Sequence, residues 1–323
     1  FKTGLAEAVG LWVVNKAGTG EVKLMGAVML VTIILSSVSS NTGTVACLMP
    51  VVIGIANAAN IPASKELMPL AVAANVGGTI TMIGTPPNVI VTGALSAAGL
   101  PSFGFFEFAL IGVPLSVIVL VYMLTIGRKT IPAKSAGDMD EEAVKAAKEE
   151  AGASDDNAPK SKTKMWISGL ILIGVVVAMA LNLKTVPLQT AAVTGAILCV
   201  ITGCLKEKEA YAGIDWVTIF LFAGMLSVAT AMDKTGAGKL IADTVVGMMG
   251  EHPNPIILCA VLYLISNVLT QFMSNTASAA LLAPIGISIA QSIGADPKPV
   301  LMSIGIAASM AFATPMATPP NTL

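Results

Sequence analysis

Apolar stretches of membrane-spanning length alternate along this chain with short polar breaks. A helix needs about 20 residues to cross a bilayer, and three runs are expected to form spanning helices: 107–126, 165–182 and 187–204. Another apolar run begins near Trp216. The shorter stretch 4–17 predicts either an amphipathic helix in the membrane interface or the frayed end of a spanning helix. The pattern as a whole predicts an all-α polytopic membrane protein.

Two polar motifs each occur twice inside the apolar sequence. SNT at 40–42 is followed by TPPN at 85–88, and SNT at 274–276 is followed by TPPN at 318–321. From the asparagine of SNT to the threonine of TPPN, the separation is 44 residues in the first copy and 43 in the second. The matching order and spacing predict a duplicated structural unit. Repeats with polar breaks at matching places are typical of secondary transporters.

Each SNT motif separates two apolar helices. Serine, asparagine and threonine are favoured where a helix starts, because their side chains accept hydrogen bonds from the amides of its first turn. The first motif therefore predicts the tip of a re-entrant helical hairpin over 21–60, with a second helix from Val45, and the second motif predicts a hairpin over 255–292. Each TPPN interrupts a further apolar run, 67–91 or 299–323, and leaves unpaired backbone groups at membrane depth.

Residues 128–164 differ from the rest in being rich in Asp, Glu, Lys, Ala and Ser, and predict a solvated linker. The linker divides the chain into a first repeat, 1–127, and a second repeat, 165–323. Basic residues gather at both ends of the linker and after Cys204, which places these loops in the cytoplasm by the positive-inside rule. An odd number of predicted helices separates the two hairpins, so the repeats are expected to be inverted, with tips entering from opposite faces.

Composition agrees with membrane insertion and excludes several function classes. Apolar residues make up 55% of the chain and charged residues 11%, with a mean hydropathy of +0.83, whereas a soluble domain carries roughly 25% charged residues. The lipid bilayer is thus the expected environment. A net charge of −1 leaves no basic surface for nucleic acid. No Ser/His/Asp set, HExxH motif or intramembrane carboxylate pair occurs, so we do not expect an enzyme.

A hairpin tip at membrane depth presents two kinds of charge. The carbonyl end of the incoming helix, with serine and asparagine oxygens nearby, suits a hard cation such as Na⁺, and the amide end of the outgoing helix suits an anion. Neither break carries an acidic or basic side chain. Bound sodium and helix amides would then supply the positive potential that an anion needs. Such hydroxyls often bond only their own helix, but the doubled motif favours a site.

These motifs resemble those of the divalent anion:sodium symporter family, whose members transport dicarboxylates, citrate and sulfate. The resemblance rests on both SNT motifs, GTPPN at 84–88 and ATPPN at 317–321, and covers essentially the whole chain. It implies an elevator-type transporter that is a homodimer in its full-length form. Phe1 is not an initiator residue, and family members carry further helices before Phe1 and after Leu323. We therefore expect a chain truncated at both ends.

The resemblance also implies two sodium sites and one anion site. The first sodium would be held by Ser36, Ser40, Asn41 and Gly84. The second sodium would be held by Thr270, Ser274, Asn275 and Ala317. The anion would contact Asn41, Thr42, Thr85, Pro86, Asn275, Thr276, Thr318 and Pro319.

The expected function is sodium-coupled import of a small divalent anion, most simply a C4 dicarboxylate, across a bacterial inner membrane with linker 128–164 in the cytoplasm. Two alternatives share the fold: a sodium-independent anion exchanger, and a permease for citrate, sulfate or another oxyanion. An anion channel is disfavoured because the chain lacks the ring of charged residues expected of a pore.

Overall fold

A computed structural model of the chain describes residues 3–17, 20–133, 161–181, 187–249, 254–314 and 317–322. Regular secondary structure in these ranges is helical, and no strand occurs among them. Four helices are long and apolar enough to cross a membrane: Glu21–Val38, Asn41–Ala58, Ala109–Thr130 and Lys162–Ala180. The prediction of an all-α polytopic membrane protein is confirmed.

The described helices form two compact units. Unit 1 takes residues up to Gly84 and from Gly104 to Ile214, and unit 2 takes Thr85–Phe103 and residues from Asp215 to Thr322. Unit 1 contains α1 (Leu5–Ala17), α2 (Glu21–Val38), α3 (Asn41–Ala58), α4 (Ser64–Gly78), α6 (Ala109–Tyr122), the π-helical turn η1 (Met123–Gly127), α7 (Arg128–Thr130), α9 (Lys162–Ala180), α10 (Leu188–Ile201) and α11 (Glu207–Ala212). Unit 2 contains α5 (Pro86–Ala97), α12 (Trp216–Thr235), α13 (Ala237–Met249), α14 (Pro255–Thr270), α15 (Asn275–Ser292), α16 (Pro297–Ser309) and α17 (Pro319–Thr322).

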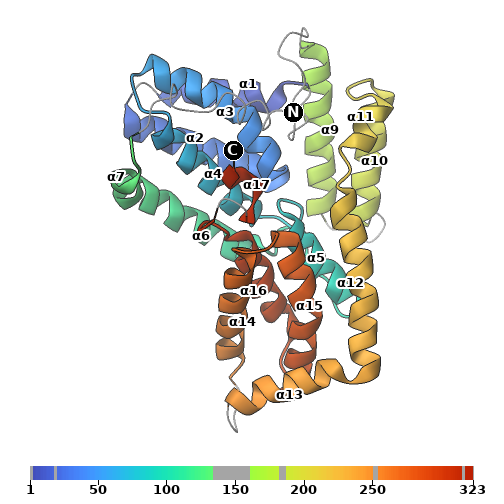
Figure 1. The fold of residues 1–323 in the computed structure, drawn as a ribbon. Helices are drawn as coiled ribbons and strands as arrows, with labels where there is room; N and C mark the ends of the chain where they lie inside the picture. The colour runs from blue at the N-terminus through green and yellow to red at the C-terminus, as the bar shows by residue number, and fades with distance from the viewer. Residues whose placement is uncertain are drawn as a thin grey trace. The chain divides into compact units, whose positions relative to one another are not determined.

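The core of unit 1 lies where α4 packs along α2 and against α3 (Figure 1). Leu24, Val28 and Val31 recur at helical spacing on α2 and are at most 3% exposed, so one face of α2 meets α3 and α4. Met25 and Met29 are also fully buried, in a second cluster with residues of α4, η1 and α6. Helix α2 is therefore buried on two faces, and α3 and α4 are held in place by it.

Helices α6 and α9 have a different character, because their apolar side chains are largely exposed. Leu110 and Ile118 on α6 are 75% and 64% exposed, and Leu170 on α9 is 68% exposed. Apolar surface of this kind on a spanning helix is what contact with lipid requires. Helices also extend into both ends of the predicted linker, since α7 ends at Thr130 and α9 begins at Lys162. Most of that linker, 134–160, lies outside the described residues.

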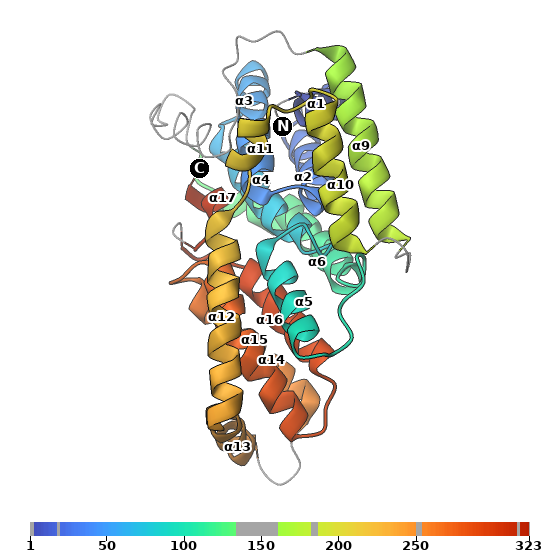
Figure 2. The ribbon, with the colours of Figure 1, turned by 90° about the vertical axis from the view of Figure 1, so that its right-hand side faces the viewer.

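In unit 2, helices α14, α15 and α16 pack together, and α5 lies along α15 and α16 (Figure 2). A Cβ atom at Gly305 of α16 would lie 3.1 Å from the Val91 side chain of α5, so the glycine permits a close approach. The helix that follows the first TPPN motif thus packs with the second hairpin. The compact units differ in this way from the predicted repeats 1–127 and 165–323, which stay a prediction from the sequence.

Two helix pairs and two helix breaks flank the repeated motifs. The first pair is α2 and α3, and the second is α14 and α15. The chain leaves helix α4 after Gly78 and resumes as α5 at Pro86, and it leaves α16 after Ser309 and resumes as α17 at Pro319. Helix α3 starts at Asn41 rather than at the predicted Val45, because the Ser40 side chain caps it there.

Candidate sodium and anion sites

The tip between α2 and α3 places three oxygen atoms together in unit 1. The hydroxyl of Ser36, in the last turn of α2, lies 2.6 Å from Oδ1 of Asn41 and 2.7 Å from the carbonyl oxygen of Ala74 on α4. Ser36 is fully buried and Asn41 is 9% exposed. We call this group, Ser36, Asn41 and the Ala74 carbonyl, the first oxygen cluster.

In the first oxygen cluster, the Ser36 hydroxyl lies within hydrogen-bonding distance of two acceptor oxygens. Serine donates one hydrogen bond, yet Ser36 faces both the Asn41 amide oxygen and the Ala74 carbonyl at bonding distance. Nδ2 of Asn41 lies 3.5 Å from Oδ1 of Asn75, which orients the amide with its oxygen toward Ser36. The Asn41 amide oxygen and the Ala74 carbonyl thus meet at the Ser36 hydroxyl, and neutral oxygens of this kind are ligands that a hard cation prefers.

Two glycines bring the broken helix against this cluster. A Cβ atom on Gly78 would lie 2.4 Å from Oδ1 of Asn41 and 3.0 Å from the carbonyl oxygen of Gly84. A Cβ atom on Gly84 would lie 2.4 Å from the carbonyl oxygen of Gly78. Only glycine allows approaches of this closeness. The predicted ligand Gly84 thus lies against Gly78, which in turn contacts Asn41.

The tip between α14 and α15 repeats the arrangement in unit 2. The hydroxyl of Thr270 lies 2.8 Å from Oδ1 of Asn275 and 2.8 Å from the carbonyl oxygen of Ala308 on α16. Thr270 is fully buried. These groups form the second oxygen cluster. The sequence separations match those of the first cluster, 5 residues from hydroxyl to amide and 38 from hydroxyl to carbonyl in both.

The motif serines cap the outgoing helices. Oγ of Ser40 accepts from the amide of Gly43 at 3.3 Å, and Oγ of Ser274 accepts from the amide of Ala277 at 3.2 Å. Both helices run for 18 residues, so their N-termini carry the partial positive charge of a full helix dipole. No group of three or more His, Cys, Asp or Glu side chains gathers anywhere in the described ranges. The oxygens of both clusters belong to hydroxyl, amide and carbonyl groups, which are neutral.

The residues expected to contact the anion are divided between the units. Asn41 and Thr42 belong to unit 1, and the following belong to unit 2: Thr85, Pro86, Asn275, Thr276, Thr318 and Pro319. Thr85 and Thr318 are buried, at 1% and 4% exposed, and Ala317 is 2% exposed. Oγ1 of Thr85 lies 3.4 Å from Oγ of Ser309 on α16, which ties the first TPPN loop to unit 2.

Sequence reasoning missed the carbonyls of Ala74 and Ala308 and the position of Gly78. Backbone carbonyls occur at every residue, so no side chain marked Ala74 or Ala308. The signal that could have found them is the repeat itself, since both carbonyls follow the cluster hydroxyl by 38 residues.

The sequence of the chain matches a known protein family. A family model described as citrate transporter, CitMHS, matches residues 1–298. The chain belongs to the citrate transporter family. The resemblance to divalent anion:sodium symporters is thereby confirmed, as is the expectation that this is no enzyme, because the family consists of transporters. Family membership and four helices of spanning length make the chain part of an integral membrane protein.

Curated relatives of this member of the citrate transporter family come from bacteria and archaea. An uncharacterised transporter of Haemophilus influenzae is 32% identical over 91% of this chain and 64% of its own length. An uncharacterised transporter of Methanocaldococcus jannaschii is 28% identical over 90% of this chain and 63% of its own. The sodium-dependent dicarboxylate transporter SdcS of Staphylococcus saprophyticus is 26% identical over 98% of this chain and 65% of its own. The chain thus spans less than two thirds of the length of each of these relatives.

Proposed function

We propose that the protein is a sodium-coupled secondary transporter of a small divalent anion, with a C4 dicarboxylate as the substrate. The observation that carries this proposal is the pair of matching oxygen clusters. Each cluster combines a buried hydroxyl, an asparagine amide oxygen and a backbone carbonyl with the same sequence spacing. We assign one sodium ion to each cluster, with Ser40 and Gly84 completing the first site and Ser274 and Ala317 completing the second.

Sodium fits the chemistry of the clusters. Hard monovalent cations at membrane depth are held by neutral oxygens and by carbonyls where helices end or unwind. Buried neutral oxygens cannot hold a transition metal as thiolate or imidazole groups do. The name of the SdcS relative, a sodium-dependent dicarboxylate transporter, supports the same assignment.

The anion is assigned to the amide ends of α3 and α15 and to the TPPN threonines. Helix N-termini and threonine hydroxyls donate hydrogen bonds to a carboxylate without adding a fixed charge. Two sodium ions would balance the two charges of the dianion. This arrangement explains how an anion site forms where neither hairpin tip carries a basic residue.

The transport mechanism in this proposal is of the elevator type, with inverted repeats and a homodimer of the full-length protein. The matching clusters support a duplicated origin for the two hairpins. We place the protein in a bacterial inner membrane with the linker 128–164 in the cytoplasm, on the distribution of basic residues.

Uptake by the intact protein in proteoliposomes tests the proposal. We expect accumulation of radiolabelled succinate driven by an inward sodium gradient, and loss of accumulation when potassium replaces sodium. Uptake indifferent to sodium would contradict the coupling and favour an anion exchanger. A competition panel with citrate, tartrate and sulfate identifies the preferred anion, and strong competition by citrate alone would contradict the assignment of a C4 substrate.

Replacing Thr270 by valine tests the second sodium site. The change keeps the shape of the side chain and removes the hydroxyl that faces Asn275 and Ala308. A bond to a charged partner contributes about 1.5–3 kcal/mol, so half-saturation by sodium is expected to rise about tenfold to a hundredfold. The measurement is the initial uptake rate against sodium concentration. Thr270→Ser, which keeps the hydroxyl, is the control, and a wild-type sodium curve for Thr270→Val would contradict the site.

Replacing Thr85 or Thr318 by alanine tests the anion assignment. Each change removes a buried hydroxyl from a TPPN loop. We expect the KM for the anion to rise about tenfold, from the loss of one bond to a charged group, with a smaller change in sodium dependence. Thr92→Ala is the matched control, because the Thr92 hydroxyl bonds the Asn88 carbonyl of its own helix. An unchanged KM for both variants would show that neither threonine binds the anion.

A further inference from the structure

Glu66 is an unusual residue of unit 1, because its carboxyl group is buried without a partner. The side chain is 0% exposed, and neither carboxyl oxygen has a hydrogen-bond partner in the described structure. Glu66 lies in the first turn of α4, before the apolar run that starts at Leu67. Buried ionisable groups without partners are rare, since a charge removed from water must be compensated.

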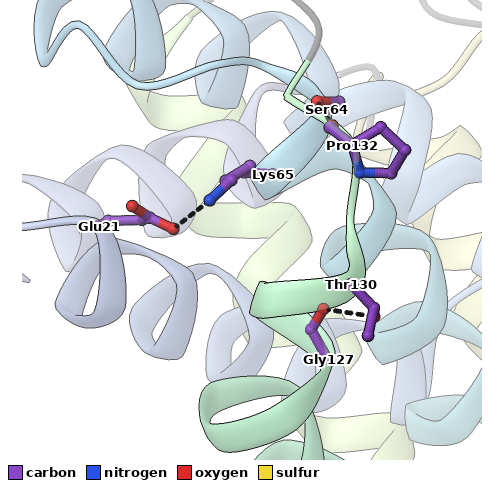
Figure 3. Close-up of polar contacts among 6 residues, drawn as sticks. All are labelled: Glu21, Ser64, Lys65, Gly127, Thr130 and Pro132. Atoms are coloured by element: carbon purple, nitrogen blue, oxygen red, sulfur yellow. Dashed lines mark hydrogen bonds and ion pairs between the residues drawn. The ribbon is translucent and has the colours of Figure 1, made fainter.

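The charged groups on the neighbouring elements do not compensate Glu66. Helix α4 packs against α2, α3 and α6, and α3 carries no Asp, Glu, Lys or Arg. On α2, Glu21 repels a charge on Glu66 and itself binds Lys65, with Nζ and Oε1 3.1 Å apart (Figure 3). The remaining charged side chains of α2 and of the α6–α7 segment are Lys23, Arg128 and Lys129. None of these cations forms an ion pair with Glu66 in the ranges that the structure describes.

This environment favours the neutral acid. Burial, and to a lesser extent the nearby Glu21, raise the pKa of Glu66 from its ordinary value of 4.5 to about 8. The protonated carboxyl carries no net charge and is tolerated in the core. Ionisation, in contrast, requires the carboxylate to reach water or a cation, and the start of α4 must then move.

The start of α4 makes polar contacts with two neighbouring segments. Ser64 donates to the carbonyl of Pro132 at 2.6 Å, just after α7, and Lys65 reaches Glu21 on α2 (Figure 3). The residue before the helix, Ala63, provides no side-chain cap. The other end of the same helix supplies the Ala74 carbonyl, Asn75 and Gly78 to the first oxygen cluster. A shift of α4 would therefore be transmitted along a single helix to that cluster.

We propose that Glu66 is a proton-binding site that keeps the start of α4 seated against α2 and α7 while its carboxyl is neutral. Loss of the proton at alkaline pH unseats this end of the helix, so unit 1 contains a pH-sensitive switch. Proton binding at Glu66 does not depend on the proposed transport function. Only the expected effect of Glu66 on sodium binding rests on that proposed function.

The sign of the pH effect follows from linkage. Between the unfolded pKa of 4.5 and the folded pKa of about 8, the folded protein binds more protons at Glu66 than the unfolded chain does. Stability contributed by this group is complete below the unfolded pKa and is lost as pH rises through this window. Glutamine at position 66 stays neutral at every pH and removes the dependence.

The test compares thermal unfolding of the intact protein and of Glu66→Gln across pH in detergent. The wild type should lose Tm relative to Glu66→Gln as pH rises from about 5 to about 8, with a constant difference above that range. Glu21→Gln leaves Glu66 able to titrate and should keep the pH-dependent loss of Tm, over a narrower pH range because Glu21 no longer raises the Glu66 pKa. Parallel pH profiles for the wild type and Glu66→Gln would overturn the proposal.

Carbodiimide labelling gives a second measurement that needs no variant. An apolar carbodiimide reacts with a protonated carboxyl in an apolar environment, and mass spectrometry of peptides locates the label. We expect Glu66 to be labelled at about pH 6 and to lose its labelling at about pH 10, because the reactive form disappears. Absent labelling, or labelling that does not change with pH, would overturn the proposal.

Sodium dependence of uptake reports the effect on the first oxygen cluster. At about pH 9, above the folded pKa, the wild type should need more sodium for half-saturation than Glu66→Gln does. If the uptake rate of both proteins is independent of sodium concentration, the proposed sodium-coupled transport is wrong. The unfolding and labelling results still decide the proton site in that case.

Discussion

Replacing Asn41 by alanine is expected to abolish sodium-coupled uptake while leaving the protein folded, and replacing Asn275 should do the same. Each asparagine is assigned to both a sodium ion and the anion. Two bonds to charged partners at about 1.5–3 kcal/mol each correspond to a loss of at least about a hundredfold in transport.

Folding should survive because neither change leaves a buried hydroxyl unsatisfied. Without Asn41, Ser36 still donates to the Ala74 carbonyl at 2.7 Å, and without Asn275, Thr270 still donates to the Ala308 carbonyl at 2.8 Å. Size-exclusion chromatography and thermal unfolding in detergent check this expectation, and uptake in proteoliposomes measures the loss of transport.

Matched controls exist on the same two helices. Asn57 on α3 and Gln291 on α15 are exposed, and their alanine variants should transport as the wild type does. Near-normal uptake by Asn41→Ala or Asn275→Ala would show that the affected cluster holds neither the cation nor the anion.

Replacing Gly78 by alanine is expected to remove transport through a single added methyl group. The new Cβ would lie 2.4 Å from Oδ1 of Asn41, closer than real Cβ atoms come, and 3.0 Å from the carbonyl oxygen of Gly84, which is a tight contact. The Asn41 amide must then rotate away from Ser36, which dismantles the first oxygen cluster. Overpacking of this kind destabilises a protein by about 1–3 kcal/mol, so Tm should fall together with sodium-driven uptake.

Gly54→Ala provides the control for the same chemical change. Gly54 is an exposed residue within α3, and a Cβ atom there would meet nothing within 4 Å. Alanine is favoured over glycine in a helix by about 1 kcal/mol, so this variant should be as stable as the wild type or slightly more so. If Gly78→Ala transported as well as Gly54→Ala, the close packing of the broken helix on Asn41 would have no functional role.

The helical hairpins and the helix breaks could be predicted because their signals are local. An apolar run of spanning length, a capping serine and a pair of prolines each act within a few residues of their own position. The start of α3 at Asn41 was missed by four residues for a similarly local reason, since Ser40 caps the helix earlier than the apolar run implied.

The contacts between distant segments could not be predicted in the same way. Helix α5 packs on α15 and α16, although it follows the first motif, and no feature of its apolar face specifies that partner. Glu66 occupies a position near a helix start where an acidic residue is usually solvated and favourable. Its complete burial results from the packing of α4 against other helices, not from its neighbours in sequence.

The repeated motifs and apolar runs were enough to predict an all-α membrane protein, and they marked the asparagines and hydroxyls beside each SNT motif. Which backbone carbonyls meet those side chains depends on how the helices pack, because every residue carries the same carbonyl group. Packing between helices likewise decided that Gly78 contacts Asn41 and that Glu66 is shielded from water. Close approach and desolvation arise between segments that are far apart in the chain, and a pattern of residue types does not encode them directly.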